Sequence, residues 1–299
     1  MMKLRLSLKS LVRAGLNLFI IAFLTLGCSS STTPTYRVSD IEKSIQDICK
    51  NEYRIDISVK LVGETLWLYV PVEDLFVKAE KPEKYTDKYE IAENKAGFID
   101  GDFNLQYAIK DVQEKEKTQD VTYNKKVMEK TNNVWKALRR AIFSMERTNS
   151  ASEPKFFCIV TADIKNGFET KEIFYYLDLK KVSYGFISVG EFQHRTIQET
   201  NIDPAIIEDR EGKHLNYIDI TMKDFIAGQI SHRIKLKFQK PEIKENADID
   251  KEIEKIVALV IKIYNFKDFK EADLYNSLTK NRIILNRAAI LTRPIEQKS

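Results

Sequence analysis

Four oxygen-bearing side chains between residues 100 and 111 have a spacing that could bind a metal ion. Asp100, Asp102 and Asn104 alternate along the chain, and Asp111 comes twelfth in the same count. This order partly matches a calcium-binding loop, but such a loop needs glycine at its sixth position, where this chain has Leu105. The segment FNLQYAI also alternates like a strand, which would turn the oxygens apart. We therefore expect a turn entering a strand, with a calcium site as the weaker alternative.

Other polar residues could support acid–base or metal chemistry. Asp163 and Asp178 flank an Asn166-Gly167 turn signal and could act as the paired carboxylates of a hydrolase. Nothing in the sequence marks a cleft around them, so we interpret them as surface charges. No nucleophile, phosphate-loop or dinucleotide motif occurs, and the sequence points to no catalytic residue and no cofactor. The histidines lack zinc-ligand spacing and are expected to be ordinary surface or half-buried residues: His194, His214 and His232.

The chain has three cysteines, Cys28, Cys49 and Cys158. Cys49 falls on the apolar face of an expected helix, and Cys158 falls on one face of an expected strand. The last two could form a disulfide in an oxidising compartment. We favour two separately buried thiols, because each fits the apolar pattern of its own element.

The first 27 residues have the pattern of a secretory signal. Basic residues come first, an apolar run from 14 to 26 follows, and no acid occurs before Asp40. The apolar run is short for a membrane span, which takes about 20 residues. The basic residues are Lys3, Arg5, Lys9 and Arg13.

The sequence LTLGC at residues 24–28 resembles the lipobox of bacterial lipoproteins, with Thr25 where leucine is usual. The resemblance implies cleavage between Gly27 and Cys28, and acylation of Cys28 with a diacylglyceryl group and a fatty acid such as palmitate. It also implies attachment to a membrane on the exported side, and Ser29 favours the outer membrane if the organism has two. A chance cysteine at the end of an ordinary signal or membrane helix is the alternative. Residues 28–38 are small and polar and read as a flexible tether.

The formal charge of +4 belongs to the signal. The chain has 48 basic residues, and the four that lie in the signal leave 44, against 44 acidic residues. A neutral mature chain lacks the basic surface that nucleic-acid binding requires, so we expect no nucleic-acid partner.

Hydrophobic periodicity predicts helices joined to hairpins. We expect a helix over 39–52 opened by a Ser39 capping box, a hairpin over 55–72 around Gly63-Glu64, and a loop or an insert over 80–95. A strand over 103–109, which the charged residues 111–120 could prolong as an exposed ribbon, a helix over 123–147 and a hairpin around Asn166-Gly167 follow. Helix followed by hairpin thus occurs twice.

The last third is expected to contain helices over 221–229 and 250–264 and a strand over 231–239. That strand would place Arg233, Lys235 and Lys237 on one face, either toward anionic headgroups or toward solvent. The fold class is α+β with mainly antiparallel hairpins packed with several helices. We expect parts over 39–120 and 121–299, or one domain over 39–299.

The favoured function is a non-catalytic, membrane-anchored envelope lipoprotein with a binding, scaffold or assembly role. Its partners would be the lipid bilayer, through acylated Cys28, and an unidentified envelope protein. An envelope hydrolase using carboxylates and a carrier of lipid or another small ligand are the alternatives.

Overall fold

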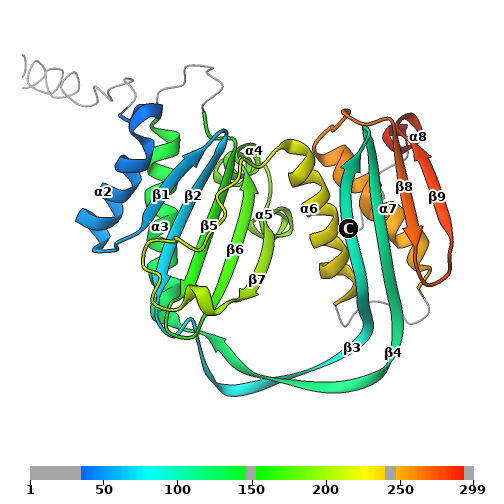
Figure 1. Ribbon diagram of the computed structural model, residues 1–299, viewed down its shortest axis with the longest axis horizontal. Coiled ribbons are helices and arrows are strands. Elements are labelled where there is room, and N and C mark those ends of the chain that lie inside the picture. The colour runs from blue at the N-terminus through cyan, green and yellow to red at the C-terminus, as the bar shows by residue number, and fades with distance from the viewer. Residues whose placement is uncertain (1–34, 146–152, 240–246, 293–299) are drawn as a thin grey trace, which may run out of the picture.

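The computed structural model describes residues 35–145, 153–239 and 247–292. These residues form two mixed sheets, ordered β1-β2-β5-β6-β7 and β3-β4-β8-β9, with helices packed against them (Figure 1). The arrangement confirms the α+β class. Among the described helices, none is both long and apolar enough to span a bilayer.

The first sheet contains the repeated helix–hairpin order. Helix α2 (Ile41–Tyr53) precedes β1 (Ser58–Val62) and β2 (Thr65–Val72), and helix α3 (Lys125–Phe143) precedes β5 (Phe156–Asp163) and β6 (Phe168–Tyr175). Both hairpins are antiparallel, and β2 pairs with β5 in parallel. The apolar faces of α2 and α3 cover one face of this sheet and form a shared core with it.

Both turn signals form hairpins. Val62 pairs with Thr65 around Gly63-Glu64, and Gly63 has φ +57°, a left-handed value that glycine adopts without strain. Asp163 pairs with Phe168, so the second turn spans 164–167 and includes Asn166-Gly167. The edge strand β7 (Ile197–Ile202) follows α4 (Tyr176–Ser183) and α5 (Val189–Arg195).

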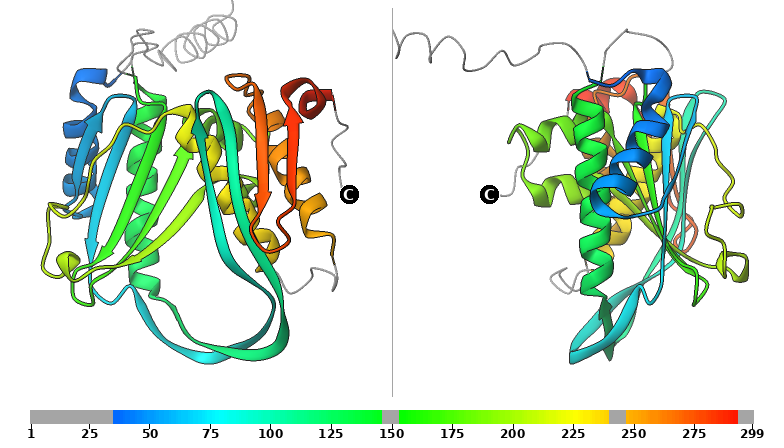
Figure 2. Two further views of the ribbon diagram at one scale, coloured as in Figure 1. Left: turned by 45° about the vertical axis from the view of Figure 1, so that its right-hand side comes forward. Right: turned by 90° about the vertical axis from the view of Figure 1, so that its left-hand side faces the viewer.

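The second sheet begins with a long ribbon inserted between β2 and α3. Strands β3 (Phe76–Ile99) and β4 (Asp102–Tyr123) leave the first sheet and return to it (Figures 1 and 2). Strand β4 pairs in parallel with β8 (Glu271–Asn276), which pairs with β9 (Arg282–Asn286). Helices α6 (Met222–Phe238) and α7 (Ile249–Ile263) pack on this sheet, and α8 (Arg287–Thr292) ends the described chain.

Two expected elements are wrong. Residues 80–95, expected to be a loop or an insert, lie in the inserted ribbon but form part of strand β3 rather than a loop. Residues 231–239, expected to be a strand, continue α6 to Phe238. The helix buries side chains four residues apart, which is a helical spacing that the apparent alternation over 232–238 concealed: Ile226, Ile230, Ile234 and Phe238.

The expected boundary near residue 120 does not separate the two sheets, because each sheet contains strands from both sides of it. Thr35 and Tyr36, expected to be part of the tether, already contact the folded body, since Tyr36 bridges to Met145 and the Thr35 amide donates to Ser144 O. Helix α2 begins after a 3-10 turn (Val38–Asp40) and has no side-chain cap, so the Ser39 capping box does not form.

Candidate functional site

The four candidate calcium ligands do not converge. Asp100 and Gly101 form the two-residue turn between β3 and β4, with φ of 52° and 88° as a type I′ turn requires. Asp102 and Asn104 then lie in β4, and Asp111 lies nine residues beyond Asp102, about 30 Å along an extended strand. Within the described ranges, no group of three or more His, Cys, Asp or Glu side chains could hold a metal ion.

The two candidate carboxylates lie in separate networks. Asp163, at the end of β5, accepts hydrogen bonds from the backbone amides of Leu75 and Asn166. Burial alone would raise the pKa of Asp163, but these bonds and the Asn166 side-chain amide hold it below its usual value. Asp178 lies in α4 rather than in the hairpin and is fully buried against Arg195. The two acids therefore do not form a catalytic pair, and the expectation that they are surface charges is wrong, because both side chains are buried.

The structure does not join Cys49 to Cys158. Both are free and buried, and they belong to clusters on opposite faces of the first sheet. Burial raises the pKa of Cys49 to about 12 and that of Cys158 well above its usual value, so both thiols stay protonated and unreactive. Gly27 and Cys28 lie outside the described residues.

Sequence reasoning missed a buried ion cluster around His214. Its Nδ1 lies 2.6 Å from Asp209 Oδ2 and its Nε2 lies 2.9 Å from Glu169 Oε2. Burial lowers the pKa of His214, but the two carboxylates outweigh it and the net pKa is raised. Because both ring nitrogens are engaged, His214 ties the loop before α6 to strand β6 and has no free nitrogen for acid–base work.

A second buried cluster joins the two sheets. Arg195 Nη1 donates to Asp178 at 2.8 Å and its Nε donates to Glu191 at 2.7 Å. From the second sheet's helices, Tyr264 donates to Asp178 at 2.8 Å and Arg233 donates to Glu191 at 3.2 Å. These bonds fix α6 and α7 against α4 and α5.

A groove lies between the facing edges of the two sheets. Helix α6 lies between the edge strands β7 and β3 (Figure 1) and contacts both. The groove has a volume of about 650 Å³ and is open to solvent. Its lining comes from residues 94–98 of β3, 197–199 of β7, and one side of α6 with its N-cap Thr221.

Two polar atoms of the groove lining have no partner among the described residues. The backbone amide of Gln198 donates to His232 Nδ1 at 3.4 Å, which puts the ring proton on Nε2. That Nε2 is buried and unpaired. Burial, with Arg233 and Lys235 adding to it, lowers the pKa of His232 to about 4, so the ring is neutral at pH 7. Asn94 donates to Ser231 O at 2.9 Å, and its Oδ1 is left buried without a donor.

The groove walls carry sheet edges and mixed charge. Among the described strands, β7 pairs only with β6 and β3 pairs only with β4, so each has one edge without a neighbouring strand, although the Gln198 backbone amide on the β7 edge is already bonded to His232. The expected basic face of the 231–239 segment does not form, since Arg233 and Lys237 pair with Glu191 and Glu252. The charged side chains of the lining are Lys95, Glu199, Lys223, Asp224 and Lys235.

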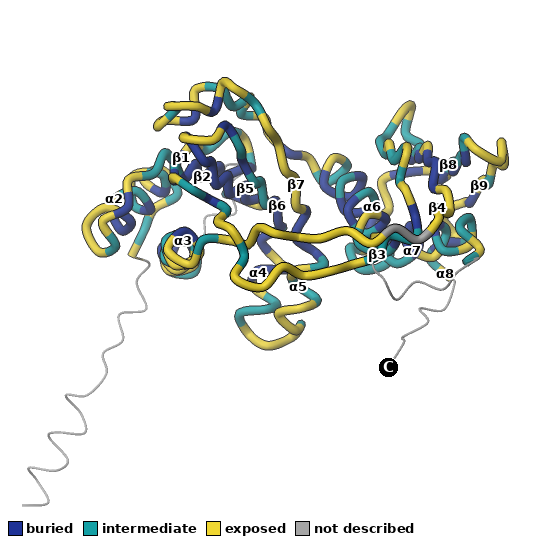
Figure 3. Tube along the Cα trace, turned by 90° about the horizontal axis from the view of Figure 1, so that it is seen from below, coloured by how far each residue is buried: buried dark blue, intermediate teal, exposed yellow. Residues whose placement is uncertain are grey.

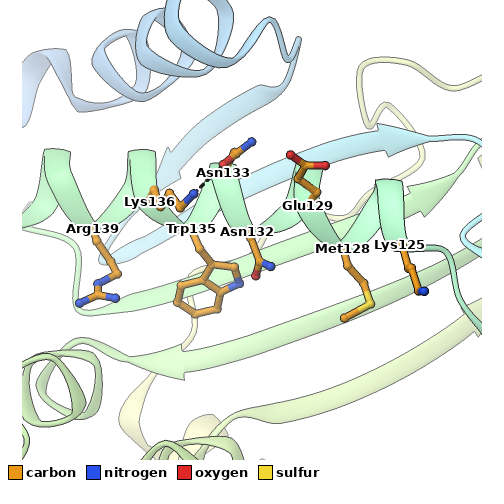
Figure 4. Close-up of a pocket in the computed structure, with 8 residues that line it drawn as sticks. All are labelled: Lys125, Met128, Glu129, Asn132, Asn133, Trp135, Lys136 and Arg139. Carbon is orange, nitrogen blue, oxygen red and sulfur yellow. Dashed lines mark hydrogen bonds between the residues drawn. The ribbon is translucent and has the colours of Figure 1, made fainter.

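A second hollow, of about 500 Å³, is a weaker candidate. All eight residues that line it come from α3, and Figure 4 shows them along the side of that single helix. Trp135 stacks on Phe174 with ring centroids 4.4 Å apart, so its ring belongs to the core packing. A hollow made by one helix has no opposing wall to hold a ligand.

Comparison with known protein families, with curated proteins and with solved structures finds no match to this chain.

Proposed function

We propose that this chain is a non-catalytic lipoprotein of the bacterial cell envelope that binds an extended segment of a partner polypeptide in the groove between its two sheets. One observation carries the proposal: two unpaired sheet edges flank a groove whose lining holds an unpaired donor and an unpaired acceptor.

An extended peptide fits the chemistry of this groove. Sheet edges bind such segments through main-chain hydrogen bonds, and a peptide offers both amide donors and carbonyl acceptors. Its carbonyl would accept from His232 Nε2 and its amide would donate to Asn94 Oδ1 once the lining side chains that bury these two atoms move aside. Leaving either atom unpaired costs about 1–3 kcal/mol, which a bound segment recovers. The five β3 residues that line the groove span about 17 Å, the length of five extended residues.

The two alternatives receive less support. A hydrolase using carboxylates would need its acids to converge, and Asp163 and Asp178 lie in separate networks. A carrier of acyl chains would need an enclosed apolar cavity, whereas this groove is open and its lining is mostly polar.

The anchor is part of the proposal. Residues 28–34 connect the acylated Cys28 to Thr35, where the described chain begins, and seven residues reach at most about 25 Å. The groove would therefore stay close to the membrane and meet partners in the envelope.

The groove is tested with a photo-crosslinking amino acid at Gln198, in cells expressing the full chain. The control site is Ile284, an exposed position on the edge strand β9 of the other sheet. We expect adducts at Gln198 to map to one short segment of one polypeptide. A synthetic peptide of that segment should compete, and it should bind His232→Phe or Asn94→Leu at least tenfold more weakly. Adducts no stronger at Gln198 than at Ile284 would refute the groove.

The anchor is tested by Cys28→Ala, with acyl labelling and membrane fractionation. The variant should lose the label and fail normal release from its signal. A wild-type chain that incorporates no lipid would refute the anchor and leave the groove experiment unaffected.

A further inference from the structure

The segment containing α4 and α5 projects from the first sheet and exposes large apolar side chains. Figure 3 shows the two helices standing away from the sheet, with their connecting loop exposed. Phe186 is 79% exposed, the highest value among the described large hydrophobic residues. Three neighbours in the segment are also exposed, and together with Phe186 we call them the α4–α5 tip: Leu177, Tyr184 and Val189.

The charges around the tip are basic. Lys180 and Lys181 lie in the last turn of helix α4, and Lys136 and Arg139 lie on the adjoining helix α3. The only acids of residues 176–195, Asp178 and Glu191, are both paired with Arg195. Aromatic side chains beside lysine and arginine are typical of surfaces that rest at a lipid headgroup boundary.

The tip lies next to the point where the tether enters the fold. The Thr35 amide donates to Ser144 O at 2.8 Å, and Tyr36 bridges to Met145. The residue before Ser144 is Phe143, whose ring centroid is 6.2 Å from that of Tyr184. The tether exit and the tip therefore share one end of α3, within the roughly 25 Å reach of residues 28–34.

We infer that the α4–α5 tip rests in the headgroup region of the membrane to which the chain is anchored. Phe186 and Tyr184 enter the boundary between headgroups and acyl chains, and Lys180 and Lys181 contact anionic phosphates. This inference rests on the proposed function for the anchor alone and does not depend on the groove. Two points of contact, one covalent and one not, would fix the orientation of the body on the membrane.

The test places a tryptophan at the tip. Phe186→Trp is made in the full chain, which is purified from membranes and reconstituted in vesicles of phosphatidylethanolamine and phosphatidylglycerol brominated near the carboxyl end of the acyl chain. The matched control is Ile202→Trp, since Ile202 is 75% exposed on β7 of the same sheet. The parent chain, with Trp67 and Trp135, supplies the background to subtract.

We expect the added emission of Phe186→Trp to shift to shorter wavelength and to be quenched at least twofold by the bromines, while that of Ile202→Trp stays unchanged. Adding Lys180→Glu and Lys181→Glu should weaken this quenching. Equal emission with and without brominated lipid at residue 186 would overturn the inference. A shift of the emission that occurs only in native membranes, and not in vesicles that contain this chain alone, would also overturn the inference. It would identify another protein, rather than lipid, as the partner of the α4–α5 tip. Acyl labelling of the same sample reports separately on the anchor.

Discussion

The ion cluster of Asp209, His214 and Glu169 predicts a pH-dependent contribution to stability that His214→Gln should remove. Each side chain of the cluster is only 8% exposed, so solvent screens the charges weakly. The substitution leaves Asp209 with its backbone donors, from Glu211, Gly212 and residue 214. Glu169 loses its cation, and this loss dominates the effect.

Hydrogen bonds to charged groups contribute about 1.5–3 kcal/mol each. The variant loses the two hydrogen bonds from His214 to the carboxylates, and the glutamine amide replaces part of one of them. We therefore expect His214→Gln to lower the free energy of unfolding by about 2–4 kcal/mol at pH 5.5. The folded pKa of His214 is raised, so its contribution is fully present below the unfolded value of about 6.5 and is lost as the pH rises through the folded pKa. Asp209 has a lowered folded pKa, and its contribution is lost as the pH falls below about 4.

Urea denaturation followed by tryptophan fluorescence, at pH 5.5, 7 and 9, measures the difference between wild type and variant. The difference should be largest at pH 5.5 and should narrow toward pH 9. His194→Gln is the control, because that side chain is 43% exposed, and we expect a change within about 0.5 kcal/mol. A loss below about 1 kcal/mol at pH 5.5, or an equal loss at all three pH values, would show that the cluster does not act as described.

Three further predictions concern stability and titration. Arg195→Met leaves the fully buried Asp178 without its cation and should lower the free energy of unfolding by about 3–5 kcal/mol. Adding Asp178→Asn should recover part of this loss. Urea denaturation of the wild type, both single variants and the double variant measures the two effects. His232 should titrate near pH 4 when followed by NMR. Because its folded pKa is depressed, its contribution to stability should fall as the pH drops from about 6.5 to 4. A titration midpoint above about pH 6 would contradict the burial of the ring. Gly167→Ala should destabilise by about 1–2 kcal/mol in thermal denaturation, since Gly167 has φ +69°, whereas Gly97→Ala meets no atom within 4 Å and should be neutral or stabilising.

Local signals predicted the elements whose environment is simple. Helix α3 packs one face on the first sheet, so its apolar residues recur at helical spacing. The turn at Asn166-Gly167 follows from backbone preference alone. In such segments a single buried face leaves a clear pattern in the sequence.

Helix α6 is different because it packs against both sheets. Phe225 belongs to a core cluster of the first sheet, and Ile226 and Ile230 belong to that of the second. Burial on several sides erases the single apolar stripe, and the remaining alternation over 232–238 resembles a strand. The strand over residues 80–95 was missed for the opposite reason, because a solvent-exposed ribbon needs no apolar face and so leaves no apolar pattern in the sequence.

The groove could not be predicted from local sequence. Asn94 and Ser231, which meet across it, are 137 residues apart. The same holds for Glu169 and His214, which are 45 residues apart. The insertion of the β3–β4 ribbon between β2 and α3 brings Asn94 to Ser231, whereas Glu169 and His214 meet because the loop before α6 returns to strand β6. No motif in the sequence signals either contact.

The inserted ribbon also sets the order in which the chain can fold. All strands of the first sheet have been synthesised once β7 ends at Ile202. Strand β4, however, pairs with β8, so Phe103 can pair with Ala272 only after that later strand has been synthesised. A chain that emerges from its N-terminus therefore carries an unpartnered ribbon while the next 150 or so residues appear. Seven of the eleven residues from 110 to 120 are charged, and such charges discourage pairing of a free edge with another chain. The charges of residues 110–120 thus protect the growing chain from self-association.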